Sequence, residues 1–378
     1  MSSSIIAAGI RDDDLKKTFL VLFLLLFLLI PAACSDSQQG DIDYSEESNR
    51  EERYSEEEIE KADESSGEDQ SERQVNLVNS LDDFDFVAYQ EDAGYLILAY
   101  YSLHDGKLDS VLMPELKEEM LLFYTGYSSL SADQIIRLQN DIALAEAIWE
   151  RVAGLIPDFY LENIAYFELF TDGEEDFIGA IEELEDRQGF FIFSLDLDDM
   201  LNNDLSLNNS LLFETIAHEL AHIITLAPGQ VSWLELEDSD PATYYIYEYD
   251  LDTAPESYVN LFFERFWTDI YLEWSDFYYE YGIQYYGEEH LYEENEQTLY
   301  DYLDDFYDKY AERFVTEYAA TSPVEDVAET FMLFVLEDKP TGNKVSDTKM
   351  RFFYEFPELV KIRDHAQEYL ESIGYSNN

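Results

Sequence analysis

Cysteine is almost absent from this chain, because Cys34 is the only one in 378 residues. A single thiol excludes an intrachain disulfide bond. Cys34 also lies near the N-terminus, directly after an apolar run. The rest of the chain therefore has neither a cysteine ligand for zinc nor a cysteine nucleophile.

Basic residues are scarce as well: 21 Lys and Arg stand against 85 Asp and Glu, which gives a formal net charge of −64. A charge of this size argues against binding to nucleic acid and against adhesion to anionic lipid. It indicates either adaptation to a salty medium that screens the self-repulsion, or a preference for cationic or neutral substrates. The even spread of acidic residues favours the first. Hydrophobic residues still make up 46% of the chain, so a substantial core can form.

The N-terminus has the pattern of an export signal. Lys16 and Lys17 precede Phe19 to Ile30, an apolar run that is too short to span a membrane as a helix. The next residues, Pro31-Ala32-Ala33-Cys34, resemble the lipobox of bacterial lipoproteins, although Pro31 is unusual at its position. The resemblance implies a signal peptide over residues 1–33 and a membrane anchor through lipidated Cys34, outside the cytoplasm. An ordinary cleaved signal or an uncleaved anchor is the alternative.

Large aliphatic side chains are nearly missing from residues 34–76, which consist mainly of Glu, Asp, Ser, Gln and Arg. Such a segment cannot bury enough apolar surface to fold. We expect a disordered acidic tether that holds the rest of the protein off the membrane, on the cell surface or the periplasmic face. The folded domain then covers residues 77–378.

Histidine is rare, yet two of the five histidines are four residues apart in His218-Glu219-Leu220-Ala221-His222. Apolar residues at helical spacing surround the motif, Asn208 or Ser210 can cap the helix, and Pro228-Gly229 can end it. Histidines four apart lie on one helix face, where both can bind one zinc ion beside the intervening glutamate. The motif predicts a zinc hydrolase with Glu219 as general base. The alternative is an amphipathic helix with two surface histidines, which is disfavoured because buried polar groups need partners.

Secondary-structure signals before the motif are a helix from Ser131 to Val152 and strands over Ile164 to Phe170 and Phe190 to Leu197. A long helix, a small sheet and then a metal-binding helix is the order of zincin-type peptidases. The expected fold class is therefore α+β: zincin-like, mostly helical, with a small mixed sheet next to the His-Glu-x-x-His helix. In that fold an edge strand pairs with the extended substrate. The second strand is the candidate edge.

Residues 231–315 predict a helical, aromatic-rich insert. Its aromatic side chains either form the walls of a substrate-binding lid or pack on the domain. Packing is the simpler interpretation and is favoured.

A catalytic zinc normally has three protein ligands. An extended motif with a third histidine is excluded, because Thr225 and Pro228 occupy its glycine and histidine positions. A downstream glutamate, the gluzincin arrangement, remains. Ser322 and Pro323 begin a helix that carries Glu325 and Glu329 on one face. Glu325 can complete a capping box instead, but a buried carboxylate pair needs a cation or hydrogen-bond donors.

The stretch from Tyr318 to Phe331 resembles the metal-binding region of the anthrax lethal factor-like peptidases and related bacterial zinc metallopeptidases. Their pattern is Tyr, a short polar turn, then Glu-x-x-Ala-Glu-x-Phe on a helix. The resemblance implies that Glu325 is the third zinc ligand, that Glu329 supports a ligand from behind, and that Tyr318 hydrogen-bonds the oxyanion. The gap of about 100 residues between His222 and Glu325 is longer than expected for the family, which leaves Glu329 as an alternative ligand.

Together these patterns predict a zinc-dependent endopeptidase that hydrolyses peptide or protein substrates outside the cytoplasm, with Zn²⁺ bound by His218, His222 and Glu325. Glu214, one turn before His218, is a candidate partner for a histidine or a solvated side chain. The alternative function is a catalytically silent zincin-fold lipoprotein that binds or scaffolds other proteins.

Overall fold

The computed structural model describes residues 95–126, 128–173, 177–184, 187–227, 229–233, 245–246, 251–277 and 292–375. The expected signal peptide, the expected tether and the first part of the expected domain, up to residue 94, lie outside these ranges. Within them the fold is α+β, with a mixed five-stranded sheet, a small three-stranded sheet and a majority of helices. No helix among the described residues combines the length and the apolar character needed to cross a membrane.

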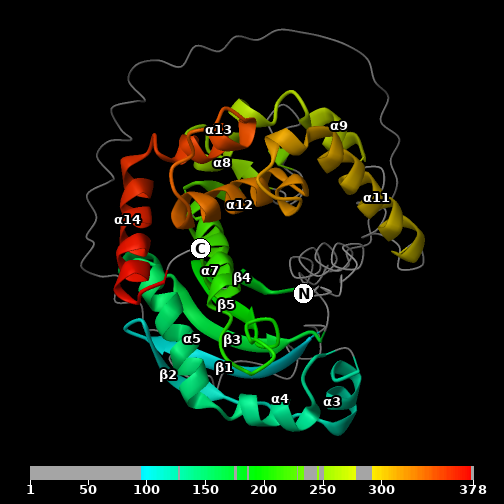
Figure 1. Ribbon diagram of the computed structural model, residues 1–378, viewed down its shortest axis with the longest axis vertical. Coiled ribbons are helices and arrows are strands. Elements are labelled where there is room, and N and C mark those ends of the chain that lie inside the picture. The colour runs from blue at the N-terminus through cyan, green and yellow to red at the C-terminus, as the bar shows by residue number, and fades with distance from the viewer. Residues whose placement is uncertain are drawn as a thin grey trace, which may run out of the picture. The chain divides into compact units, whose positions relative to one another are not determined.

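The five strands of the large sheet, the helices between them and the helix of the histidine motif make up the first half of the described fold (Figure 1). The elements are β1 (Leu96–His104), β2 (Lys107–Leu112), α3 (Glu118–Tyr124), α4 (Ala132–Gln139), α5 (Ile142–Leu155), α6 (Asp158–Leu161), β3 (Ile164–Thr171), β4 (Gly179–Leu184), β5 (Arg187–Asp196) and α7 (Asn209–Thr225).

The second half is mainly helical. Its elements are β6 (Val231–Trp233), β7 (Tyr245–Ile246), β8 (Leu251–Thr253), α8 (Tyr258–Phe266), α9 (Tyr271–Phe277), α11 (Tyr292–Tyr310), the 3₁₀ helices η6 (Ala311–Arg313) and η7 (Tyr318–Ala320), α12 (Pro323–Leu336), α13 (Val345–Phe353) and α14 (Pro357–Ser372).

The large sheet has the strand order β2-β1-β3-β5-β4. Strands β3 and β5 are parallel, whereas the other neighbours are antiparallel. Both predicted strands are confirmed as β3 and β5, but the predicted edge is wrong. β5 lies inside the sheet and β4 forms the edge, because β4 turns back on β5 as a hairpin with Ile181 opposite Phe193. The Gly-Ala-Ile-Glu-Glu-Leu sequence of β4 has too few β-branched and aromatic residues to predict a strand.

The helix predicted from Ser131 to Val152 is divided in two. Ser131 begins α4 as expected, with its backbone N–H donating to Gln134 Oε1 at 3.0 Å. The Asn140 side chain then donates to the Ile136 carbonyl at 2.7 Å, and Asp141 Oδ1 accepts from the Leu144 N–H at 3.1 Å to start α5. Short polar side chains bond nearby backbone groups in this way, and so the pair interrupts an otherwise helical apolar pattern.

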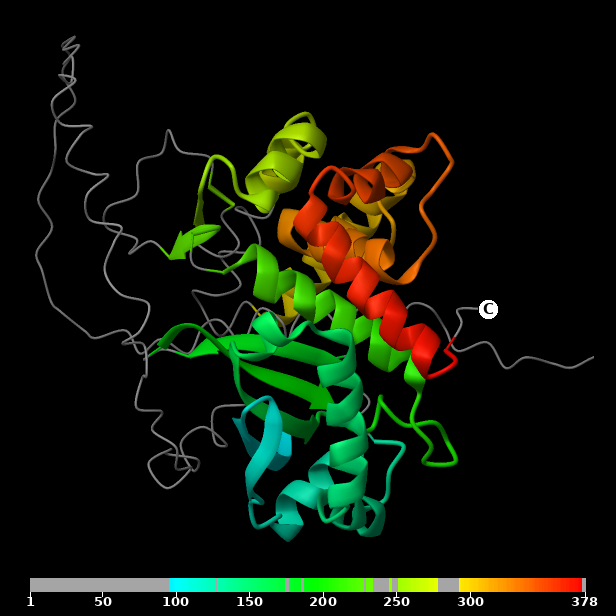
Figure 2. The same cartoon turned by 90° about the vertical axis from the view of Figure 1, so that its left-hand side faces the viewer.

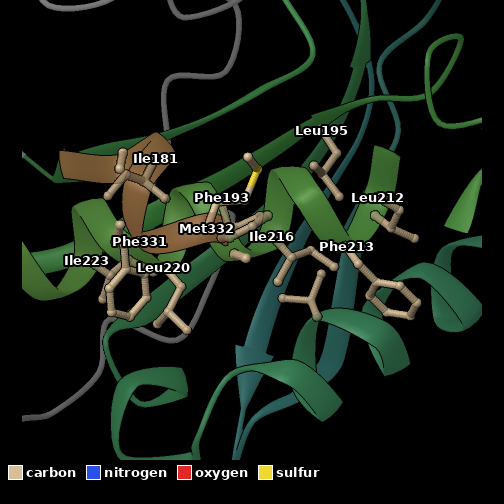
Figure 3. Packing of buried hydrophobic residues seen from close by; sticks show 14 of the residues in the cluster. Ile181, Phe193, Leu195, Leu212, Phe213, Ile216, Leu220, Ile223, Phe331 and Met332 are labelled. Atoms are coloured by element: carbon tan, nitrogen blue, oxygen red, sulfur yellow. The ribbon is translucent and has the colours of Figure 1, made fainter. Parts of the chain in front are cut away.

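Helix α7 lies in the middle of the fold. Asn208 caps its first turn by accepting from the Leu211 N–H, and its residues from the second turn onward are almost all buried. It packs against β4 and α5 on one side and against α12 on the other, as the green helix between the sheet and the orange helices in Figure 2 shows. Figure 3 shows the apolar contacts, in which Leu220 and Ile223 lie near Ile181 of β4 and Phe331 of α12. Two layers therefore hold α7 fixed.

The region predicted as a helical insert belongs to the same compact unit as the rest of the described fold. It is helical in α8, α9 and α11, but it also contains the three-stranded sheet β6-β8-β7, which was not expected. Three of its described aromatics, Phe262, Trp267 and Trp274, are almost fully buried. These three side chains pack in the core, as the packing interpretation expects.

Candidate metal centre

The two histidines of the motif lie together on the face of α7 that meets α12. Their four-residue spacing on one helix brings His222 Nε2 to 3.0 Å from His218 Nε2. Both side chains are buried. The alternative of two surface histidines is therefore excluded.

Helix α12 supplies a carboxylate to the same point. Ser322 caps the helix by accepting from the Glu325 N–H at 3.1 Å, and Pro323 occupies the first turn, as predicted. The Glu325 carboxylate turns toward α7, where its Oε2 lies 3.1 Å from His218 Nε2 and 3.5 Å from His222 Nε2. Its side chain is therefore directed at the histidines, as the metal-site alternative predicts.

These three donor atoms fit a metal ion. Four ligands at tetrahedral zinc, with bonds of 2.0–2.1 Å, are separated from one another by about 3.3 Å. The separations between His218 Nε2, His222 Nε2 and Glu325 Oε2 are 3.0, 3.1 and 3.5 Å. The group is buried and could hold a metal ion.

Glu329 lies on the other side of the His218 ring. Its Oε1 is 2.7 Å from His218 Nδ1, and its Oε2 accepts a hydrogen bond from Thr316 Oγ1 at 2.7 Å. A carboxylate at Nδ1 fixes the ring orientation and leaves Nε2 as the nitrogen with a free lone pair. Of the two glutamates, Glu325 is thus the one that contacts both Nε2 atoms. Glu329 contacts the opposite nitrogen of the His218 ring, Nδ1.

The electrostatics of the site are dominated by burial and by the mutual attraction of these groups. Burial alone would raise the pKa of Glu325, but the charges and hydrogen bonds of His222 and His218 hold that pKa well below its usual range. Burial would lower the pKa of His218, but its hydrogen bonds to Glu325 and Glu329 raise that pKa well above 6.5. The centre therefore stabilises positive charge between α7 and α12.

Glu219 points toward the sheet edge. Its side chain is 2% exposed, and the Ile181 N–H of β4 lies close enough to act on its carboxylate. Burial raises the pKa of Glu219, an effect that the two nearby histidines only partly offset. Its Oε2 has no hydrogen-bond partner among the described residues. A buried carboxylate oxygen of this kind is suited to accept a proton.

Two further candidates can be located. Tyr318 lies on η7, partly buried, with its ring centroid 5.9 Å from that of His218. Glu214 Oε1 accepts a hydrogen bond from Ser210 Oγ at 3.1 Å on the exposed side of α7. Of the two alternatives for Glu214, the solvent-facing side chain fits this position.

A second buried charged group was not predicted. Asp326, next to Glu325, pairs with Lys349 of α13, and both side chains are 0% exposed. Trp267 Nε1 donates to Asp326 Oδ2 at 2.7 Å, and Thr330 Oγ1 lies 3.3 Å from Oδ1. An aspartate in an apolar helix signals a buried partner, but its sequence does not say which of the 21 basic residues provides it.

The chain matches no protein-family model, no curated protein and no solved structure. Within the described part of the chain, the residues and geometry of this centre are therefore the only indication of function.

Proposed function

We propose that this protein is a zinc-dependent endopeptidase of the gluzincin type, with a zincin-like fold and with Zn²⁺ held by His218, His222 and Glu325. The observation that carries the proposal is the convergence of two imidazole nitrogens and one carboxylate oxygen within 3.5 Å of one another in a buried site. Two histidines and one glutamate are a common ligand set of catalytic zinc, which keeps a fourth position open.

When bound, zinc acts as a Lewis acid on the substrate carbonyl and lowers the pKa of water at the site to about 7. Glu219 accepts the proton of the attacking water at Oε2 and then returns it to the leaving amine. Burial raises the pKa of Glu219 above that of an ordinary glutamate, and this direction favours uptake of the proton. Tyr318 donates a hydrogen bond to the developing oxyanion, and Glu329 holds the His218 ring in orientation.

The sheet edge supports a peptide as the substrate. β4 is the edge strand, and its Ile181 N–H contacts Glu219, so an extended peptide that adds to this edge would run past the general base. A role outside the cytoplasm, with lipidated Cys34 as membrane anchor and peptides or proteins as substrates, completes the proposal and rests on the sequence alone.

The test compares two glutamates of the same helix in the full-length protein. Zinc content and hydrolysis of a fluorescently labelled unfolded protein are measured for wild type, Glu219→Gln and Glu214→Gln. We expect Glu219→Gln to keep its zinc and to lose about 10²- to 10⁴-fold in rate, the usual contribution of a general base. Glu214→Gln controls for the loss of one carboxylate from α7 and keeps both properties.

Undiminished hydrolysis by Glu219→Gln would exclude this mechanism. Zinc binding by the wild type without any hydrolysis would instead favour the catalytically silent binding lipoprotein.

A further inference from the structure

The hydroxyl of Thr316 joins two parts of the candidate centre that are otherwise separate. It donates to Glu329 Oε2 at 2.7 Å and accepts from the Ala319 N–H at 3.0 Å. Ala319 is the middle residue of η7, next to Tyr318. One side chain thus touches both the carboxylate behind His218 and the turn that carries Tyr318.

The direction of these hydrogen bonds is fixed by chemistry. A hydroxyl has a single proton, and a backbone N–H can only donate. Because the N–H of Ala319 uses a lone pair of Thr316 Oγ1, the Thr316 proton is directed to Glu329. The other oxygen of Glu329 meets His218 Nδ1 at 2.7 Å. A continuous series of hydrogen bonds therefore runs from the backbone of η7 through Thr316 and Glu329 to the imidazole.

The turn itself has independent support. The Ala320 N–H donates to the Glu317 carbonyl at 3.0 Å, and the Thr321 N–H donates to the Tyr318 carbonyl at 3.0 Å. Removal of the Thr316 hydroxyl is thus expected to preserve η7 as a turn. It would free the Glu329 carboxylate to rotate and would loosen the link between η7 and α12.

We propose that Thr316 is a positioning residue of the metal centre, which orients His218 through Glu329 and ties that orientation to the turn of Tyr318. The inference rests on the proposed function in that it takes His218 to be a zinc ligand. Loss of a hydrogen-bond partner of a metal-binding histidine typically weakens metal affinity 10- to 100-fold. Thr316 is one hydrogen bond further out, so the expected effect is about 10-fold.

A purely local role for Thr316, as a cap of η7, predicts something different. In that case loss of the hydroxyl lowers the thermal stability of the metal-free protein and leaves zinc affinity unchanged. The two roles therefore separate in a zinc titration that requires no enzymatic activity.

The experiment titrates the metal-free full-length protein with zinc against a chelator of known affinity. Thr316→Val keeps the side-chain shape without the hydroxyl, Thr316→Ser keeps the hydroxyl, and Thr316→Ala is a second variant without it should the valine variant misfold. We expect about 10-fold weaker zinc binding for Val and Ala, and near-wild-type binding for Ser. Unchanged affinity in the valine and alanine variants would overturn the proposal.

A double variant tests the route through Glu329. If Thr316 acts through that carboxylate, Thr316→Val has no further effect on zinc affinity in a Glu329→Gln background. Full additivity would overturn the proposed route. Because the readout is zinc affinity, absence of hydrolysis would count against the peptidase proposal alone, whereas a wild type that binds no zinc would refute the metal centre on which both depend.

Discussion

Helix α12 carries buried carboxylates on two faces, and the two faces are neutralised differently. Asp326 contacts Lys349, Trp267 and Thr330, so a basic side chain of the protein itself faces its carboxylate. The neighbouring Glu325 meets two imidazoles, which are cationic only when protonated. The Asp326 cluster therefore contains its own basic partner. The Glu325 cluster instead has nitrogen and oxygen atoms that can bind either protons or a metal ion. This difference separates a structural ion pair from a binding site on adjacent residues of one helix.

Burial dominates the pair on the structural face. It raises the pKa of Asp326 against the opposing influence of Lys349, and it lowers the pKa of Lys349 against that of Asp326. Breaking such a pair costs much more than replacing both members, because one desolvated charge is left behind.

The largest expected effect is therefore the loss of stability when Lys349 is replaced. Lys349→Met leaves Asp326 buried without its cation and is expected to lower the free energy of unfolding by about 3–5 kcal/mol. Urea unfolding of the metal-free and the zinc-loaded protein should give the same loss. The double variant Asp326→Leu/Lys349→Met serves as the control and should recover most of the stability. If zinc restored the stability of Lys349→Met, the Asp326 and Glu325 faces of α12 would not be independent.

The second prediction concerns the metal face. Zinc at 100 times its dissociation constant is expected to raise the free energy of unfolding of the wild type by about 2.7 kcal/mol, by mass action. His222→Ala removes a donor atom and should show little of this gain over the same concentrations. Lys349→Met, which is less stable but keeps all three donors, should show it in full. Equal stabilisation of wild type and His222→Ala would contradict the assigned ligands.

The third prediction is a pH dependence. The pKa of His218 is raised, since its hydrogen bonds to Glu325 and Glu329 outweigh the opposing effect of burial. In the metal-free protein its contribution to stability is fully present below about 6.5, the unfolded value, and is lost as pH rises through the higher folded pKa. Zinc binds only the neutral ring, so below that folded pKa zinc affinity should fall about tenfold per pH unit.

Zinc titrations between pH 5 and 9 measure this competition. Glu329→Gln removes one of the groups that raise the pKa of His218, so its loss of affinity should begin at a lower pH than in wild type. Curves that coincide would show that Glu329 does not act on His218.

The smallest expected effect is at Glu214. Its side chain bonds Ser210 on the exposed side of α7, so Glu214→Ala should change the free energy of unfolding by less than about 0.5 kcal/mol. Its zinc affinity should equal that of wild type in the same titration. A loss of affinity would show that Glu214 does support a histidine.

Local signals predicted the two halves of the centre well. The spacing of His218 and His222 and the cap at Ser322 depend only on residues a few positions apart. Local sequence could not distinguish Glu325 from Glu329 as the ligand, because both lie on one face of α12. The position of α12 along its axis, relative to α7, determines which of the two contacts the Nε2 atoms. Strand β4 was missed because its composition carries too weak a strand signal, although its partner β5 follows directly in the chain. The partner of Asp326 was missed because Lys349 lies on another helix, 23 positions away.

The packing of α12 on α7 closes a loop of about 100 residues between His222 and Glu325. Loop-closure entropy grows slowly, so doubling such a loop costs only about 0.6 kcal/mol. Folding rate is more sensitive, because contacts between distant segments form late. The centre is thus expected to be among the last parts of the protein to assemble.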